Sequence, residues 1–232
     1  MKVLIIIPTL NEVNNIPKLI NKILSISNYN ILVIDDNSQD GTLEILKKLK
    51  RKFKRFNFIL RKNSTGIGSA HLFGITYAYK KKFKFCISLD ADGTHNPHEI
   101  KKMINLMKTD NYDIINTSRF LKSNSLSDWP LLRVIITKFR YNLVKFFLKT
   151  KFDSSSGYRC YNLSYIDPKI FLKAKNENYF FLIETLYYLE REHYRIIDIP
   201  IKLKYRDSGE SKMRIFHIME SFLSLISLSM RN

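Results

Sequence analysis

The first 117 residues alternate short, unbroken apolar runs with stretches in which apolar residues recur at helical spacing. An unbroken run is typical of a strand buried on both faces, and a periodic stretch is typical of an amphipathic helix. Repeated units of this kind predict an α/β fold with a mostly parallel sheet covered by helices on both sides. We expect strands at Val3–Ile7, Ile31–Ile34, Phe56–Leu60, Phe83–Leu89 and Tyr112–Asn116.

The second half of the chain has a different character and is dominated by helical patterns. Residues 128–149 are predicted to form a long amphipathic helix, and residues 179–192 a shorter helix. A strand-like segment, Ile196–Tyr205, and a loop, Arg206–Lys212, lead to a final amphipathic helix over residues 213–232.

Two carboxylates, Asp90 and Asp92, follow the apolar run that ends at Leu89. Residues two apart on an extended backbone point to the same side, so these carboxylates face each other where a buried strand meets solvent. Their repulsion would favour protonation of one of them unless a cation lay between them. An oxygen-only site of few carboxylates suits Mg²⁺ or Mn²⁺ that holds a substrate's phosphates. Acidic pairs are also common in turns, so whether this pair binds a metal has to be judged from the neighbouring motifs.

Composition narrows the choice of partner and compartment. The formal net charge of +18 favours a polyanionic partner, namely nucleic acid, an anionic bilayer or a phosphorylated ligand. Two cysteines, Cys86 and Cys160, indicate no disulfide framework. The apolar run before Pro8 is too short for a signal peptide, and no stretch approaches the about 20 apolar residues that span a bilayer. We therefore expect a soluble or peripheral protein in the cytoplasm.

Several motifs occur in a characteristic order along the chain. The four main segments are Pro8–Glu12, Asp35–Thr42, Asp90–Pro97 and Arg206–Met213. Between them lie Gly66–Ala70, Ser118–Phe120 and Ser156–Arg159. This order resembles family 2 glycosyltransferases of the GT-A fold, and more narrowly the dolichyl-phosphate mannose synthase and polyprenyl-phosphate glycosyltransferase branch. The resemblance covers residues 3 to about 213.

The resemblance implies a donor site and a metal site. Residues that match the family's nucleotide-sugar-binding positions are Pro8, Asn11, Glu12, Asp35, Asp36, Gly66, Gly68, Asp90, Ala91 and Asp92. The metal, Mg²⁺ or Mn²⁺, would be held by Asp90, Asp92 and Thr94, with Asp92 as the more direct ligand. The two glycines would let backbone approach the nucleotide, or would only form an ordinary helix-entry turn.

The resemblance also implies an acceptor site. Inverting transfer to a hydroxyl would need a general base, whereas a lipid phosphate is already anionic and needs cations to hold it. Residues that match acceptor- or sugar-binding positions are Arg119, Arg133, Ser156, Arg159 and Glu184. The catalytic set would be Asp92, Arg119, Arg133, Arg206 and Lys212, with the last two closing over phosphates on a loop. Without the family, each arginine would be interpreted as a surface ion pair.

We therefore expect an inverting, metal-dependent transferase that moves mannose or glucose from GDP-mannose or UDP-glucose to polyprenyl or dolichyl phosphate. Residues 1–212 would form one GT-A domain, with a nucleotide-sugar half (1–117) and an acceptor half (118–212). Its amphipathic helices would attach it to the cytoplasmic face of a membrane, or would serve packing or dimerisation.

Two alternatives stay open. A family 2 transferase could act on a saccharide or protein hydroxyl instead. A basic module that binds nucleic acid or a membrane surface fits the charge, although no RNA-binding motif is found and nucleic acid is not expected.

Overall fold

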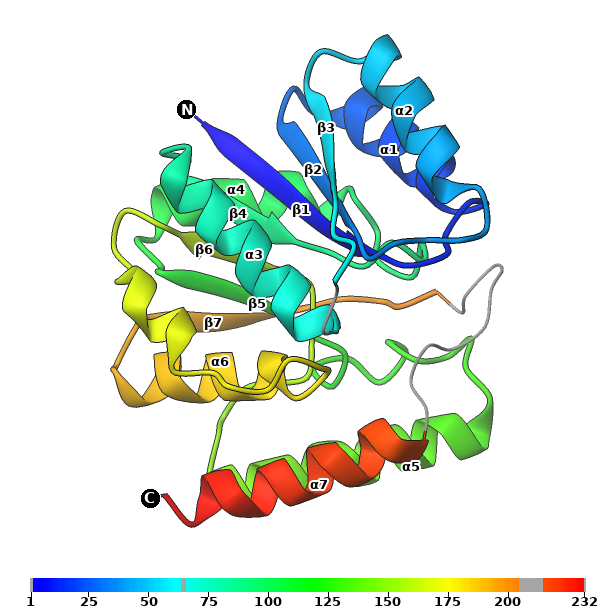
Figure 1. The fold of residues 1–232 in the computed structure, drawn as a ribbon. Helices are drawn as coiled ribbons and strands as arrows, with labels where there is room; N and C mark the ends of the chain where they lie inside the picture. Colours follow the sequence, from blue (N-terminus) through cyan, green and yellow to red (C-terminus); the bar gives the residue numbers. More distant parts are fainter. Residues whose placement is uncertain (1, 64–65, 205–214, 232) are drawn as a thin grey trace.

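The computed structural model describes residues 2–63, 66–204 and 215–231 (Figure 1). Within these ranges one seven-stranded sheet has the order β3-β2-β1-β4-β6-β5-β7. Its strands are β1 Val3–Thr9, β2 Asn30–Asp35, β3 Phe56–Leu60, β4 Phe85–Ser88, β5 Ile114–Ser118, β6 Arg159–Asn162 and β7 Ile196–Pro200. The predicted α/β architecture is confirmed.

The sheet is parallel except at β6. Strands β3, β2, β1 and β4 pair in parallel, as do β5 and β7. Strand β6, which the sequence did not predict, lies between β4 and β5 and is antiparallel to both. Because β1, β2 and β4 share one direction, the loops that follow Thr9, Asp35 and Ser88 meet at one edge of the sheet, where open α/β sheets bind ligands.

Helices cover both faces of the sheet. On one face the core includes α1 (Ile16–Ile26), α2 (Thr42–Lys52) and α4 (Glu99–Thr109). On the other it includes α3 (Ile67–Lys80), the 3₁₀ helix η1 (Pro168–Leu172) and α6 (Phe181–Arg191). Alternate residues of β1 enter the two cores, as expected for a strand buried on both faces.

Two further helices form a layer beyond α6. Helices α5 (Leu131–Leu148) and α7 (Ile215–Ser229) run side by side, although long stretches of chain separate them (Figure 1). Val144 and Leu148 of α5 share an apolar cluster with Leu225 and Leu228 of α7. Helix α7 is also tied to the segment before α6, because Glu220 accepts hydrogen bonds from the side-chain amides of residues 176 and 178.

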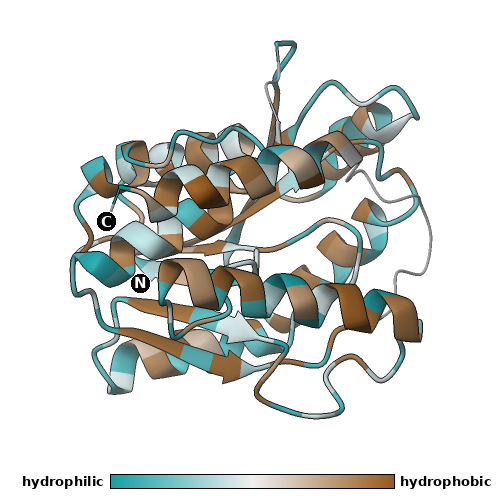
Figure 2. Cartoon of the chain, turned by 90° about the horizontal axis from the view of Figure 1, so that it is seen from below, coloured by the Kyte–Doolittle hydropathy of each residue, from teal (hydrophilic) through white to brown (hydrophobic). Residues whose placement is uncertain are grey.

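Many large apolar residues of these two helices are exposed, some of them at the surface and some toward the cavity described below. Figure 2, seen from the side on which they lie, shows hydrophobic residues along both. The exposed large apolar residues are Leu131, Leu132, Ile135, Ile136, Phe139 and Phe146 of α5, and Phe216, Ile218, Met219, Phe222 and Leu223 of α7. Neither helix, nor any other in the described ranges, has the length and apolarity needed to cross a bilayer.

Candidate active site

A cavity of about 1290 Å³ opens at the carboxyl ends of β1, β2 and β4 and extends to α5 and α7. Its acidic lining residues are Glu12, Asp36, Asp90 and Asp92. Its arginines are Arg119, Arg133 and Arg140. Its apolar wall is formed by residues of α5 and α7 together with Trp129, Phe180, Ile183 and Leu203. One cavity therefore joins an acidic part, a cationic part and an apolar part.

The loops after β1 and β2 are fastened to each other by short polar side chains. Asp35 accepts hydrogen bonds from the hydroxyl and backbone N–H of Ser38, at 2.6 and 3.0 Å. The same hydroxyl accepts from the backbone N–H of Asn11, and the Asn11 side chain accepts from the backbone N–H of Gln39. Burial raises the pKa of Asp35, although the Ser38 hydrogen bonds oppose that shift. Asp35 and Asn11 do not line the cavity, so they position the loops instead.

Of the expected donor-binding residues in the loops after β1 and β2, Pro8, Glu12 and Asp36 line the cavity. Both oxygens of Asp36 accept hydrogen bonds from the Arg61 guanidinium, at 2.7 and 2.8 Å. Arg61 also donates to the carbonyl of Gly66, so it joins the β2 loop to the segment that enters α3. No sequence pattern pointed to Arg61, because a single basic residue after a strand is ordinary.

Both glycines allow close packing against the segment that leads into α6. Gly66 lines the cavity with φ of +136°, and a Cβ there would lie 2.5 Å from the Glu177 carbonyl oxygen and would also clash with the Asn178 side chain. Gly68 does not line the cavity, and a Cβ on it would lie 2.5 Å from the Cβ of Phe181. The bare backbone of Gly68 lets the start of α6 pack against α3, and a role of Gly68 in letting a nucleotide approach stays a prediction.

The acidic pair lies in the loop after β4. Asp92 accepts hydrogen bonds from the backbone N–H and hydroxyl of Thr94, at 3.1 and 2.8 Å. The backbone N–H of Asp90 donates to His95 Nδ1 at 3.1 Å. A Cβ on Gly157 would lie 3.0 Å from Asp90 Oδ1, so the bare glycine leaves room for that carboxylate.

The donor atoms of this loop fit a hard divalent cation. Asp90, Asp92 and Thr94 all line the cavity and offer side-chain oxygen alone. Ala91, between the two carboxylates, also lines the cavity but is largely buried. Residues 2–63, 66–204 and 215–231 contain no group of three or more His, Cys, Asp or Glu side chains that could hold a metal by themselves. A cation here would therefore draw further ligands from water or from a bound phosphate.

On the acceptor side, Arg119 is oriented by a buried carboxylate. Its Nε and one NH₂ nitrogen donate to the two oxygens of Asp153 at 3.0 and 3.3 Å, and that NH₂ also donates to Ser155 Oγ at 2.7 Å. Burial alone would raise the pKa of Asp153, but the Arg119 charge and these hydrogen bonds outweigh it and hold that pKa below its ordinary value. Arg119 and Ser155 line the cavity.

Two other expected acceptor residues also line the cavity. The Arg133 guanidinium lies 4.4 Å from the centre of the Trp129 ring, a cation–π arrangement that fixes its direction. The Ser156 hydroxyl lies 2.8 Å from the Thr117 hydroxyl, with which it shares a hydrogen bond. Ser156 is nevertheless buried, so it meets the cavity at its inner wall.

Arg159 and Glu184, which were expected to bind acceptor or sugar, lie elsewhere. Arg159 is completely buried in β6, and its nitrogens donate at 2.6–2.9 Å to Asn116 Oδ1, Leu182 O and Ser154 O. Glu184 is buried in α6 and accepts hydrogen bonds from the backbone N–H groups of residues 175 and 176. Neither lines the cavity, and their hydrogen bonds support structural roles, while acceptor or sugar binding by them stays a prediction. Arg206 and Lys212 lie outside the described residues.

Sequence reasoning missed two polar residues of α5 that line the cavity, Thr137 and Arg140. They follow Arg133 at i+4 and i+7, so all three share one face of the helix. That spacing can be read from the sequence, but in this helix it runs beside the apolar stripe, which is the stronger pattern.

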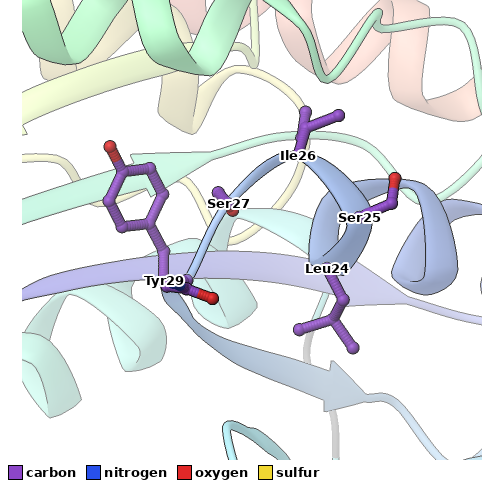
Figure 3. Close-up of a pocket in the computed structure, with 6 residues that line it drawn as sticks. Leu24, Ser25, Ile26, Ser27 and Tyr29 are labelled. Carbon is purple, nitrogen blue, oxygen red and sulfur yellow. The ribbon is translucent and has the colours of Figure 1, made fainter.

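A second depression, of about 410 Å³, lies at the end of α1 and is lined by the contiguous segment 24–29 (Figure 3). Figure 3 shows the side chains of Leu24, Ile26 and Tyr29 pointing in different directions. The segment precedes β2, so it lies at the opposite edge of the sheet from the cavity, and it carries no charged side chain.

Comparison with known proteins gives a consistent result. The family model for "Glycosyl transferase family 2" matches residues 4–171. The chain is 27% identical to polyprenol monophosphomannose synthase of Mycolicibacterium smegmatis, over 99% of this chain and 88% of that protein. It is 26% identical to undecaprenyl-phosphate mannosyltransferase of Micrococcus luteus, over 92% of this chain and 88% of that protein.

Solved structures with a similar fold are more distant in sequence. Mannosyl-3-phosphoglycerate synthase of Rubrobacter xylanophilus has a TM-score of 0.66 at 13% identity, over 100% of this chain and 74% of that one. A mannosyltransferase of Pyrobaculum calidifontis, solved with GDP-Man and Mn²⁺, has a TM-score of 0.60 at 12% identity, over 100% of this chain and 64% of that one. These likenesses show the fold.

Proposed function

Because this chain belongs to glycosyl transferase family 2 and is therefore a glycosyltransferase, we propose that it moves a mannosyl group from GDP-mannose to a polyprenyl phosphate, with inversion. The observation that carries the proposal is the single cavity in which acidic strand-end loops, arginines and an apolar wall follow one another. These three parts match a nucleotide-sugar diphosphate with its cation, a phosphate and a hydrocarbon chain. The names of the two relatives favour mannose over glucose.

A divalent cation, Mg²⁺ or Mn²⁺, held by Asp90 and Asp92 would neutralise charge on the departing diphosphate. Thr94 orients Asp92 for that role through two hydrogen bonds, and Gly157 leaves space for Asp90. Asp36 and Glu12 also line the cavity, and we propose that they accept hydrogen bonds from the nucleoside. These residues form the donor half of the site.

The distribution of carboxylates favours a phosphate acceptor over a hydroxyl. Among the described residues that line the cavity, every carboxylate comes from the loops after β1, β2 and β4. Helices α5, α6 and α7 present no acid to the cavity in the part of the chain that the structure covers, and the nearby Asp153 is already bonded to Arg119. A hydroxyl acceptor needs a base on its own side, whereas a phosphate oxygen attacks as an anion.

Arg119 and Arg133 are the groups that would hold the acceptor phosphate. Each is held in a defined direction, Arg119 by Asp153 and Arg133 by the Trp129 ring. Guanidinium groups bind phosphate through paired N–H donors, so preorganised arginines lower the entropy lost on binding. The apolar wall beyond them would receive the first isoprene units.

The exposed apolar faces of α5 and α7 support attachment to a membrane surface. Leu131, Leu132 and Phe146, which do not line the cavity, are between 70% and 77% exposed, far more than an ordinary packed helix leaves open. A pair of interfacial helices with the net charge of this chain suits an anionic bilayer. Because the same helices wall the cavity, a lipid could pass from the bilayer to the arginines without crossing water.

The test is transfer of labelled sugar from GDP-mannose and, in parallel, from UDP-glucose into an organic-extractable lipid. Reactions contain undecaprenyl phosphate and Mn²⁺ or Mg²⁺, with and without EDTA. The proposal predicts EDTA-sensitive label in the lipid phase from GDP-mannose. Donor binding without lipid label would overturn the lipid acceptor, and label from UDP-glucose alone would overturn mannose.

A further inference from the structure

Arg140 of α5 is a cavity-lining arginine that is assigned to neither the donor nor the acceptor in the proposed function. It shares a helix face with Arg133 and Thr137, and all three line the cavity. Its neighbours along the helix, Phe139 and Leu143, belong to the apolar wall. Arg140 therefore marks the boundary between the cationic and the apolar parts of the cavity.

Within the described part of the chain, the Arg140 guanidinium donates no hydrogen bond. Burial, reinforced by the nearby Arg119 charge, lowers the pKa of Arg140 to about 10, while Asp153 opposes that shift. The side chain thus stays protonated at neutral pH. Asp153 does not satisfy it, because its two oxygens already accept from Arg119 and Ser155. A partly desolvated cation without a hydrogen-bonded acceptor is unfavourable unless a ligand supplies one.

The charges around Arg140 suit a phosphate monoester. Arg119, Arg133 and Arg140 face the cavity, and Asp153 is the carboxylate that the structure places against Arg119. Counted over these four described residues, the excess is two positive charges, close to the charge of about −1.5 to −2 on a phosphate monoester at neutral pH.

We propose that Arg140 is a third arginine of the acceptor-phosphate site, which binds the phosphate of the polyprenyl phosphate where its hydrocarbon chain begins. The inference rests on the proposed function and deepens it. Arg140 makes the site select a chain that is phosphorylated over the same chain that ends in a hydroxyl. It also sets the depth at which the phosphate stops, because the lining beyond it on α5 is apolar.

The test compares Arg140→Gln with Lys138→Gln, which removes one positive charge from an exposed position of the same helix that does not line the cavity. We expect Arg140→Gln to raise the KM for undecaprenyl phosphate by about ten- to a hundredfold, the usual worth of a hydrogen bond to a charged group. The dissociation constant for GDP-mannose should stay within about twofold, because no donor-side residue is changed. Lys138→Gln should leave both values unchanged.

Farnesyl phosphate and farnesol, used as competing inhibitors, separate charge recognition from cavity shape. Arg140→Gln should weaken inhibition by farnesyl phosphate and leave inhibition by farnesol unchanged, and Arg140→Lys should restore part of the difference. An unchanged KM, or equal weakening for both inhibitors, would overturn the role of Arg140. If the wild-type enzyme transfers no sugar to any lipid phosphate, the proposed function fails instead, so the two failures are distinguishable.

A measurement on the wild-type protein covers the case in which the variants do not fold. Phenylglyoxal modifies accessible arginines, and mass spectrometry locates the adduct. Farnesyl phosphate should protect Arg140 from modification, and farnesol at equal concentration should not. Equal modification with and without farnesyl phosphate would contradict the inference.

Discussion

The Arg119 guanidinium donates to both carboxylate oxygens of Asp153, which is completely buried. Removal of one partner of a buried ion pair strands the other, so Asp153→Asn should lower the free energy of unfolding at pH 7 by about 3–5 kcal/mol. Urea unfolding measures this. Asp110→Asn, at an exposed position, is the control and should change it by no more than about 0.5 kcal/mol.

The same pair predicts a pH dependence. The pKa of Asp153 is lower in the folded protein than its ordinary value of 3.8, so its stabilisation is present above pH 3.8 and is lost as the pH falls through the folded pKa. The difference in unfolding free energy between wild type and Asp153→Asn should therefore shrink below pH 3.8. A difference that stays constant from pH 7 to pH 3 would show that the charge of Asp153 is not what stabilises the fold.

Asp92 should be essential for activity and dispensable for folding. It is partly exposed at the cavity, where it accepts a hydrogen bond from the Thr94 hydroxyl, so Asp92→Asn removes charge without opening the core. We expect transfer to fall by about a thousandfold or more, as for loss of a metal ligand, with the melting temperature nearly unchanged. Glu44→Gln, on the exposed side of α2, serves as the control. Substantial activity in Asp92→Asn would refute the metal assignment.

Gly66→Ala should destabilise the protein more than Gly41→Ala does. Both glycines have positive φ, +136° and +94°, so both substitutions strain the backbone. At Gly41 the added Cβ meets its nearest atom at 3.7 Å, whereas at Gly66 it meets the Glu177 carbonyl at 2.5 Å. We expect a loss of about 1 kcal/mol at Gly41 and about 3 kcal/mol or more at Gly66, measured by thermal and urea unfolding. Equal losses would mean that residues 177 and 178 move aside freely.

Membrane attachment predicts that exposed apolar residues of α5 matter for binding to vesicles. The double variant Leu132→Gln, Phe146→Gln changes residues that are 70% and 77% exposed and do not line the cavity. Each loses an apolar side chain worth about 1.5–3 kcal/mol on burial, so binding to anionic vesicles should weaken by at least about tenfold. Tyr165→Gln with Leu172→Gln, exposed apolar positions outside α5 and α7, is the matched control in the sedimentation assay. Equal weakening by both pairs would argue against a specific membrane face.

The strand–helix half of the fold was predictable because unbroken apolar runs alternate there with apolar residues at helical spacing. Strand β3 begins and ends at the predicted residues, and β1 begins at the predicted residue. Strand β6 was not predictable, since its four residues include a buried arginine whose partners are distant in sequence. The expected strand at Ile196–Tyr205 was too long, and β7 ends at Pro200.

The candidate site was predictable where local sequence fixes position and unpredictable where tertiary packing does. The loops after β1, β2 and β4 had to meet, because parallel strands end at one edge. Whether a motif residue then faces the cavity depends on its partners, as Asp35 and Arg159 show. The helical spacing of Arg133 and Arg140 could have been read in advance, but only the fold shows that this face of α5 looks into the cavity.

The antiparallel insertion of β6 has a consequence for how the chain acquires its structure during synthesis. The four strands β3, β2, β1 and β4 require nothing beyond Ser88, so they can pair while the ribosome is still making the rest. Strand β5 emerges next, yet its described partners, β6 and β7, are encoded only after α5. In a nascent chain that ends between Ser118 and Arg159, the apolar strand β5 therefore has no partner strand at either edge. The sheet is complete only when β6 inserts between β4 and β5, which have already been synthesised. This late insertion is the step at which we expect misfolding and chaperone binding to be most frequent.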